Sequence, residues 1–191
     1  IGSFIFFSNG VLFRFSDDLQ IKYKNAVTAI NDWSYPAPNL KVGNNNVRFI
    51  KGNSDKNILF IGASHIEQTF PYVESFNSEY NVYYVTVGGC FVTPSYVHPK
   101  VSCSNIQNYK EIINDVRFDK IVTSIYLLNG FLAEDNKVKA KQVEGRIDEY
   151  NNFLRFVKSK AREVFLILGE PGGPNFDPSL SVRYDLKNYI T

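Results

Sequence analysis

Four short apolar segments, separated by polar stretches, predict the strands of a β-sheet. Segments of this length that are rich in Val, Ile, Tyr and Phe and bounded by turn residues are typical of buried strands. Between and before them, apolar residues recur at helical spacing, which predicts helices. The predicted strands cover residues 58–61, 82–87, 120–127 and 164–168, and the predicted helices cover residues 17–32, 66–76, 106–116 and 141–160.

Strands and helices alternate along the chain, and this order predicts an α/β fold with a mainly parallel sheet and right-handed crossovers. Residues 1–15 are apolar around a Ser-Asn-Gly turn and predict a hairpin or a linker strand. Residues 34–46 are rich in Pro, Gly and Asn and predict a loop. We therefore divide the chain into a linker or extension, residues 1–50, and an α/β domain, residues 51–191.

The composition is that of an ordinary globular chain, with 44% hydrophobic and 21% charged residues among 191. The formal net charge of +2 is too small to indicate a nucleic-acid partner or an anionic membrane surface. No apolar segment reaches the roughly 20 residues that span a bilayer. Because the chain contains no methionine, we expect it to be a piece of a longer protein or a processed product.

The first predicted strand is followed by Gly62, Ala63 and Ser64, where a helix would begin. A serine in this place lies at the carboxyl end of the strand, where nearby backbone amides can stabilise an oxyanion. Strand, Gly-x-Ser and helix is the arrangement that presents a nucleophile for acyl transfer. The alternative is that Ser64 only caps the helix.

The ends of the next two strands add groups that suit the same chemistry. Gly88 and Gly89 follow the second strand, and Asn129 follows the third. A glycine amide can approach a substrate closely, and an asparagine side chain can donate to the same oxyanion. The alternative is that the glycine pair makes a tight turn and that Asn129, followed by Gly130, belongs to a common turn dipeptide.

The two cysteines, Cys90 and Cys103, flank a short loop, residues 91–102. A structural zinc site needs four ligands at suitable spacing, and these are absent, so we expect no zinc. The spacing leaves open whether the thiols are free or paired. A bridge would stabilise the fold by about 3 kcal/mol on the chain-entropy estimate and would place the chain in an oxidising compartment.

The order Gly-x-Ser, Gly and Asn at successive strand ends resembles the SGNH hydrolases, also called the GDSL esterase and lipase superfamily. Within it, the chain more closely resembles the extracytoplasmic SGNH domain of acyltransferase-3 membrane proteins, which O-acetylate surface polysaccharides. That subgroup has a histidine after the serine, as in residues 61–65, and a Gly-Cys segment with a second cysteine downstream, here Cys90 and Cys103. Residues 8–15 resemble the stretch that follows its last membrane helix.

The resemblance implies a three-layer α/β/α, flavodoxin-like fold in which Ser64 forms an acyl-serine and Gly89 and Asn129 help to hold the oxyanion. It also implies an extracytoplasmic location, in the periplasm or cell envelope, with attachment to an inner-membrane domain that delivers the acyl donor. This location favours a bridge between Cys90 and Cys103. The acceptor would be a surface polysaccharide or lipopolysaccharide, and neither a cofactor nor a metal is implied.

The chain departs from the family pattern in three places. Ala63 replaces the aspartate of Gly-Asp-Ser, and Asn129 is followed by glycine rather than aspartate. No Asp-x-x-His is present, because the histidines are His65 and His98 alone. The family's catalytic Asp-His pair follows a fifth strand, so we expect that block to be missing from this chain. Without a base, serine is a weak nucleophile, and we expect the chain alone to be a poor catalyst.

The remaining polar residues have modest expected roles. His65 neighbours the nucleophile, so it would support the site or contact substrate rather than act as the base. We expect His98 to be exposed on its loop, and Asp177 and Asp185 to be solvated loop residues rather than groups that orient a base. Three alternatives stay open: an SGNH esterase, a non-catalytic carbohydrate-binding or interaction module lined by tyrosines, and a flavodoxin-like signalling or nucleotide-binding domain. The last lacks phosphate-binding motifs.

Overall fold

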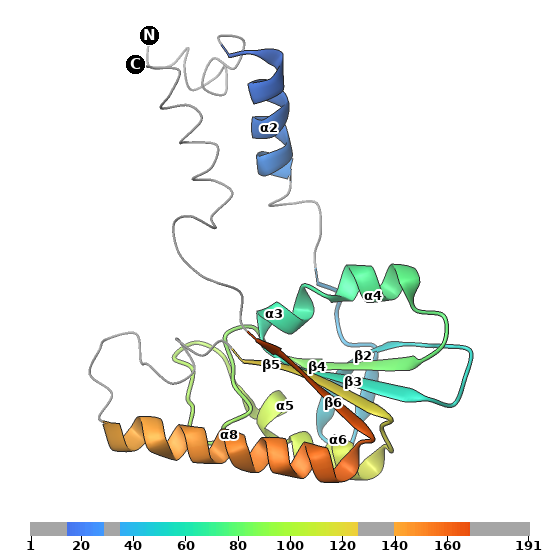
Figure 1. Ribbon diagram of the computed structural model, residues 1–191, viewed down its shortest axis with the longest axis vertical. Helices are drawn as coiled ribbons and strands as arrows, with labels where there is room; N and C mark the ends of the chain where they lie inside the picture. Colours follow the sequence, from blue (N-terminus) through green and yellow to red (C-terminus); the bar gives the residue numbers. More distant parts are fainter. Residues whose placement is uncertain (1–14, 29–34, 126–139, 169–191) are drawn as a thin grey trace. The chain divides into compact units, whose positions relative to one another are not determined.

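The computed structural model describes residues 15–28, 35–125 and 140–168, which belong to two separate units (Figure 1). The first unit comprises residues 1–34 and 171–191, and the second, here called the main unit, comprises residues 35–170. The described part of the first unit contains helix α2 (Asp17–Thr28), which confirms the first predicted helix over these residues. Asp17 and Asp18 lie in its first turn, where negative charge favours a helix.

The main unit is built on a six-stranded sheet with the strand order β1-β2-β4-β3-β5-β6. Neighbouring strands β4, β3, β5 and β6 run parallel, whereas β2 is antiparallel to β4 and β1 is antiparallel to β2. The α/β fold with a mainly parallel sheet is therefore confirmed. The strands are β1 (Leu40–Val42), β2 (Asn45–Ile50), β3 (Asn57–Gly62), β4 (Asn81–Thr86), β5 (Lys120–Ile125) and β6 (Glu163–Leu168).

The predicted loop over residues 34–46 is wrong in its second half, where β1 and β2 form a hairpin at one edge of the sheet. Gly43, at φ +55°, makes the turn. The side chain of Asn45 is buried and donates to the Asn105 carbonyl at 2.6 Å, and the Asn105 amide oxygen accepts from the Asn46 N–H at 2.7 Å. Tertiary hydrogen bonds therefore let polar residues occupy a strand that local propensity disfavours.

Helices lie on both faces of the sheet (Figure 1). Two predicted helices are each divided into two short ones. Between α3 and α4, the Thr69 N–H and hydroxyl both bond to the Ile66 carbonyl, and Pro71 starts the next helix. In Figure 1, α3 (Ser64–Glu67) and α4 (Phe70–Phe76) lie on one face, and α5 (Ser104–Gln107), α6 (Tyr109–Asp115) and α8 (Ala140–Lys160) lie on the other.

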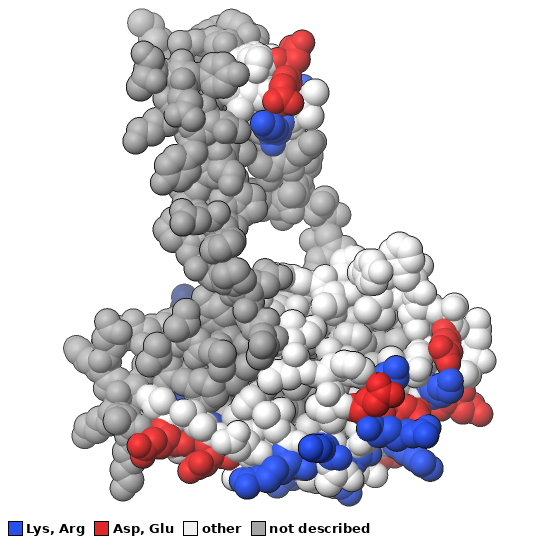
Figure 2. Space-filling model, in the orientation of Figure 1, with Lys and Arg blue, Asp and Glu red and all other residues white. Residues whose placement is uncertain are grey.

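Alternate residues of the central strands enter two separate hydrophobic clusters. Leu59 and Ile61 of β3 point to the face of α8 and pack with Phe153, whereas Phe60 points to the face of α4. There Phe60 stacks on Tyr84 with a ring-centre distance of 4.6 Å. Lys158 and Lys160 lie in the last turn of α8, where the helix dipole favours positive charge, and Figure 2 shows basic side chains over this part of the molecule.

Alkaline pH is expected to destabilise the main unit. Burial raises the pKa of Tyr35 and Tyr150 to about 12, and it also raises the pKa of Tyr84, whose hydroxyl pairs with that of Thr69 at 2.9 Å. A tyrosine with a raised pKa contributes stability that is complete below the unfolded pKa near 10. That contribution is lost as pH rises through the folded pKa, at roughly 1 kcal/mol per pH unit for each group.

Urea unfolding midpoints between pH 9 and pH 12 measure this effect. We expect the free energy of unfolding to fall steeply above pH 10 and to fall less steeply in Tyr84→Phe, which cannot ionise there. Replacement of the exposed Tyr72 by phenylalanine is the matched control and should leave the slope unchanged. Identical slopes for all three proteins would contradict the assignment.

Candidate functional site

The candidate site lies at the carboxyl end of β3, the strand that is flanked on both sides by parallel neighbours. From β3 the chain goes first to β4 on one side and later to β5 on the other. Successive connections that leave a strand in opposite directions open a crevice outside the carboxyl ends of the strands. Ser64 follows β3 directly, so the predicted position at the end of a central strand is confirmed.

Ser64 is exposed and is the first residue of α3. The N-cap is Ala63, and no side-chain hydrogen bond caps the helix. The alternative interpretation of Ser64 as a helix cap is therefore wrong. Within the described residues, its hydroxyl and its backbone N–H have no hydrogen-bond partner. Both groups are therefore available to a bound molecule.

Gly62 allows the turn before Ser64 to pack tightly. A Cβ atom at this position would lie 2.8 Å from Cγ1 of the fully buried Ile66 and 3.3 Å from the hydroxyl oxygen of Ser124. A glycine therefore lets α3 close over the end of β3, and the end of β5 contributes a second hydroxyl beside the turn. The sequence contains no local signal for Ser124, since its contact with Gly62 arises only when the strands pair.

The end of β4 is joined directly to this turn. The Val87 N–H donates to the Gly62 carbonyl at 3.2 Å, and the Cys90 N–H donates to the Val87 carbonyl at 3.1 Å. Between them, Gly89 has φ +75°, a conformation that favours glycine. Its N–H has no acceptor among the described residues. An unpaired amide therefore lies at the strand end next to Ser64, and its role in an oxyanion hole stays a prediction.

Glu67 is a polar residue of the site that the sequence pattern does not single out. A Cβ atom on Gly88 would lie 3.8 Å from its carboxylate oxygen, so α3 contacts the glycine pair through this side chain. Nearby, the Tyr35 hydroxyl pairs with that of Thr86 at 2.8 Å, and the Arg48 guanidinium lies 3.9 Å from the centre of the Tyr35 ring. The sequence feature that could have pointed to Glu67 is its spacing from Ser64, one helical turn.

Cys90 and Cys103 form a disulfide, with their Cα atoms 5.4 Å apart. The loop that they close is also tied down by side chains. The Gln107 amide donates to the Thr93 carbonyl at 2.9 Å and to the Tyr96 carbonyl at 2.8 Å. Both the backbone N–H and the hydroxyl of Ser95 donate to Glu149. Residues 91–102 are therefore anchored to α5 and α8 as well as to β4.

His98 is half-buried, so the expectation of an exposed loop histidine is wrong. A Cβ atom on Gly89 would lie 3.0 Å from its Nε2 and 3.2 Å from its Cδ2. The reason is that the closed loop folds back over the glycine pair and lays the imidazole edge against Gly89. Sequence spacing alone does not contain this contact, although the disulfide that begins one residue after Gly89 limits how far the loop can extend.

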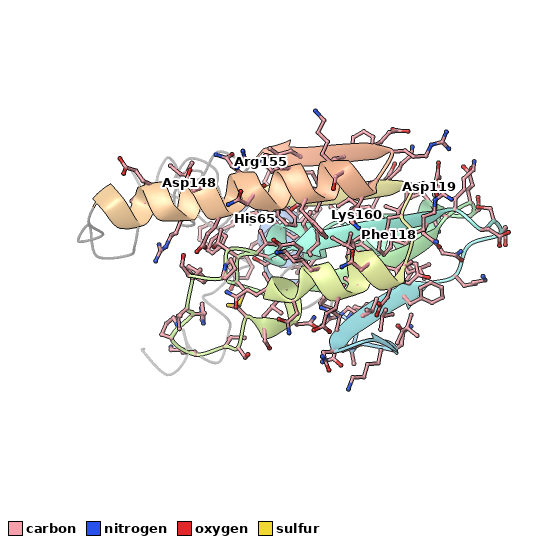
Figure 3. All side chains as sticks on the ribbon, turned by 90° about the horizontal axis from the view of Figure 1, so that it is seen from below. His65, Phe118, Asp119, Asp148, Arg155 and Lys160 are labelled. Atoms are coloured by element: carbon pink, nitrogen blue, oxygen red, sulfur yellow. A yellow bond between two sulfur atoms is a disulfide. The ribbon has the colours of Figure 1, made fainter. Side chains whose placement is uncertain are left out.

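His65 is half-buried and lies toward the carboxyl end of the sheet, whereas Asp119 marks the opposite end (Figure 3). Within the described residues, no hydrogen bond joins the Ser64 hydroxyl to His65 or His98. Asn129 lies outside the described residues, and so do Asp177 and Asp185. Their predicted positions therefore stay predictions.

Comparisons of this chain with protein-family models, with curated proteins and with solved structures return no match. Among the helices that the structure describes, none has the length and apolar character needed to cross a membrane. The described part of the chain also contains no group of three or more His, Cys, Asp or Glu side chains that could hold a metal ion. The disulfide indicates an oxidising, extracytoplasmic compartment.

Proposed function

We propose that the main unit is an SGNH-type acyltransferase or esterase domain in which Ser64 carries the acyl group. One observation carries this proposal. An exposed serine hydroxyl without an internal partner lies at the carboxyl end of the central parallel strand, and the backbone N–H groups of Ser64 and of Gly89, which follows the neighbouring strand, are also unpaired within the described residues. A nucleophile next to oxyanion donors is the combination that acyl transfer requires.

The strand order supports the finer fold assignment. Among the parallel strands, the chain runs through β3, then β4 on one side, then β5 and β6 on the other. This is the beginning of the flavodoxin-like order, in which ligands bind where the strand order reverses. With helices on both faces of the sheet (Figure 1), it fits the three-layer α/β/α architecture that the resemblance implies.

In the proposed reaction, Oγ of Ser64 attacks the carbonyl carbon of an acyl donor. The carbonyl oxygen becomes an oxyanion that accepts hydrogen bonds from the Ser64 and Gly89 amides, with Asn129 as a further proposed donor. The leaving group departs and leaves an acyl-serine, which a sugar hydroxyl or water then attacks. The family pattern assigns the proton transfers to an Asp-x-x-His pair, which the sequence of this chain does not contain.

The oxidising compartment supported by the Cys90–Cys103 bridge suits an acceptor outside the cytoplasm. On this basis we propose a surface polysaccharide or lipopolysaccharide as acceptor. A membrane acyltransferase domain would supply the acyl donor at the cell envelope, as the family resemblance implies.

A carbohydrate-binding module without catalytic activity is the second candidate. Tyr72 and Phe76, one turn apart on α4, are 68% and 71% exposed, and their ring centres lie 4.6 Å apart. Large aromatic side chains exposed together often mark a binding surface, and flat rings can pack against sugars. This function requires nothing of Ser64, so the two candidates are separable.

Covalent labelling tests the proposal. The protein is incubated with an aryl acetate, quenched in acid, and analysed by intact mass and peptide mapping. We expect one acetyl group on the peptide that contains Ser64, and none there in Ser64→Ala. Ser78→Ala, which removes another exposed serine hydroxyl, is the matched control and should label normally. Acetyl groups spread over lysines, equally in all three proteins, would contradict the proposal and favour the binding module.

A further inference from the structure

The tautomer of His98 is fixed by its surroundings. Its Nδ1 accepts hydrogen bonds from two backbone donors, the N–H groups of Lys100 and Val101, each at 3.1 Å. A nitrogen that accepts has no hydrogen of its own, so these bonds assign the hydrogen of the neutral imidazole to Nε2. A proton on Nδ1 would face both backbone donors and break both bonds.

The other ring nitrogen points toward the candidate site. Nε2 is the ring atom nearest to the place where a side chain on Gly89 would begin, 3.0 Å from that position. Within the described residues, Nε2 has no hydrogen-bond partner. An N–H donor is therefore presented beside Gly89, whose own N–H is also unpaired.

This tautomer is the opposite of the one that a catalytic base needs. The histidine of a Ser-His-Asp triad accepts the serine proton at Nε2, while its Nδ1–H donates to the aspartate. His98 has the hydrogen at Nε2 and acceptor bonds at Nδ1, so it cannot take a proton from Ser64 in this arrangement. An imidazole of this kind can act instead as a neutral donor to a carbonyl oxygen or an oxyanion.

The loop holds the donor in place before any substrate binds. The disulfide closes residues 91–102, Gln107 bonds to two of the loop's carbonyls, and Ser95 is bonded to α8 through Glu149. Donors that are fixed in advance stabilise a developing charge without the cost of rearranging during the reaction. A histidine on a loop attached in these ways meets this requirement.

We propose that His98 donates a hydrogen bond from Nε2 to the acyl oxygen during attack by Ser64, next to the Gly89 amide. It is then a catalytic residue of the oxyanion hole and not the general base. The inference rests on the proposed function, because it needs an acyl group at Ser64. It also identifies a donor at the end of β4 that the family pattern of Ser, Gly and Asn does not include.

The rate of Ser64 acetylation by an aryl acetate tests this role in the whole chain. We expect His98→Ala to lower that rate roughly 100-fold or more, as loss of one oxyanion donor does. His98→Gln should recover part of the rate, because its amide N–H can donate. Val97→Ala, at the 82% exposed neighbour, is the control and should behave like the parent protein. The shape of the pH dependence should be the same in all four proteins, since His98 does not accept the proton of Ser64 in this arrangement.

The outcomes separate the two proposals. If the parent protein is not acetylated at Ser64, the proposed function fails, and this inference fails with it. If the parent is acetylated and His98→Ala is equally fast, only the inference is overturned. A tautomer measurement by ¹⁵N NMR of the histidine ring gives a readout independent of activity. We expect a hydrogen on Nε2 of His98, and a hydrogen on Nδ1 would overturn the assignment whatever the rates are.

Discussion

Replacing Ser64 with alanine is expected to abolish acetylation at residue 64 by an aryl acetate and to remove the part of the aryl alcohol release that depends on this serine, because no other group there takes over the attack. The fold should be almost unaffected. The hydroxyl is exposed and has no hydrogen-bond partner within the described residues. A surface substitution of this kind changes the free energy of unfolding by about 0.5 kcal/mol or less. Stopped-flow release of the aryl alcohol and a urea titration measure the two quantities separately.

The pH dependence of the same reaction shows whether the protein supplies a base. An aryl leaving group departs without a proton, so only the attack by Ser64 needs base catalysis. If an imidazole acts, the rate levels off above its ordinary pKa of about 6.5. If hydroxide from the solvent acts as the base, the rate rises about tenfold per pH unit up to pH 9, which is below the range in which the buried tyrosines ionise.

We expect the steady rise, and we expect His65→Ala to leave it unchanged. No hydrogen bond connects the Ser64 hydroxyl with either histidine in the described residues, and Nδ1 of His98 is already used as an acceptor. A plateau near neutral pH that disappears in His65→Ala would show that His65 is the base. Equal rates for Ser64→Ala and the parent protein would remove Ser64 from the chemistry altogether.

The strands that position Ser64 could be predicted from sequence because local pattern and burial agree in them. Residues of β3 and β4 are apolar and contact helices on both faces, so a continuous apolar segment is the expected signal. The turn at Gly62 could be predicted from the sequence for the same reason, since a buried strand must end before an exposed serine. These features depend on neighbours in the chain, which the sequence contains.

The parts that could not be predicted depend on contacts between distant residues. The hairpin of β1 and β2 contains three consecutive asparagines, and the side-chain amide nitrogen of Asn45 donates to a carbonyl 60 residues away. The break before α4 follows from the Thr69 bonds to Ile66. His98 contacts Gly89 only because the loop between the cysteines turns back on itself. Each of these contacts forms only in the folded protein, so the neighbouring residues in the sequence do not predict it.

Reducing the Cys90–Cys103 disulfide is expected to destabilise the main unit by about 3 kcal/mol, since the bridge closes a loop with a sequence separation of 13. Comparing the oxidised and reduced forms of the same protein keeps every side chain in place. This matters because Cys90 and Cys103 are only 1% and 6% exposed, and alanine substitutions would also leave cavities. Urea midpoints with and without reductant measure the change. A titration that finds two free thiols in the native protein would contradict the bridge.

Reducing the disulfide should also slow acetylation of Ser64. We expect the acetylation rate per folded molecule to fall, and not only the fraction of molecules that are folded. Gly89 directly precedes Cys90, and His98 lies inside the closed loop, so the bridge fixes both proposed donors at once. The bonds from Gln107 and Ser95 remain in the reduced protein, so we expect a looser loop rather than an unfolded one. Hydrogen exchange should rise in residues 91–102 while β3 stays protected. If exchange rises in the loop and the acetylation rate per folded molecule is unchanged, then the loop contributes stability alone and donors fixed by it are not needed for the attack.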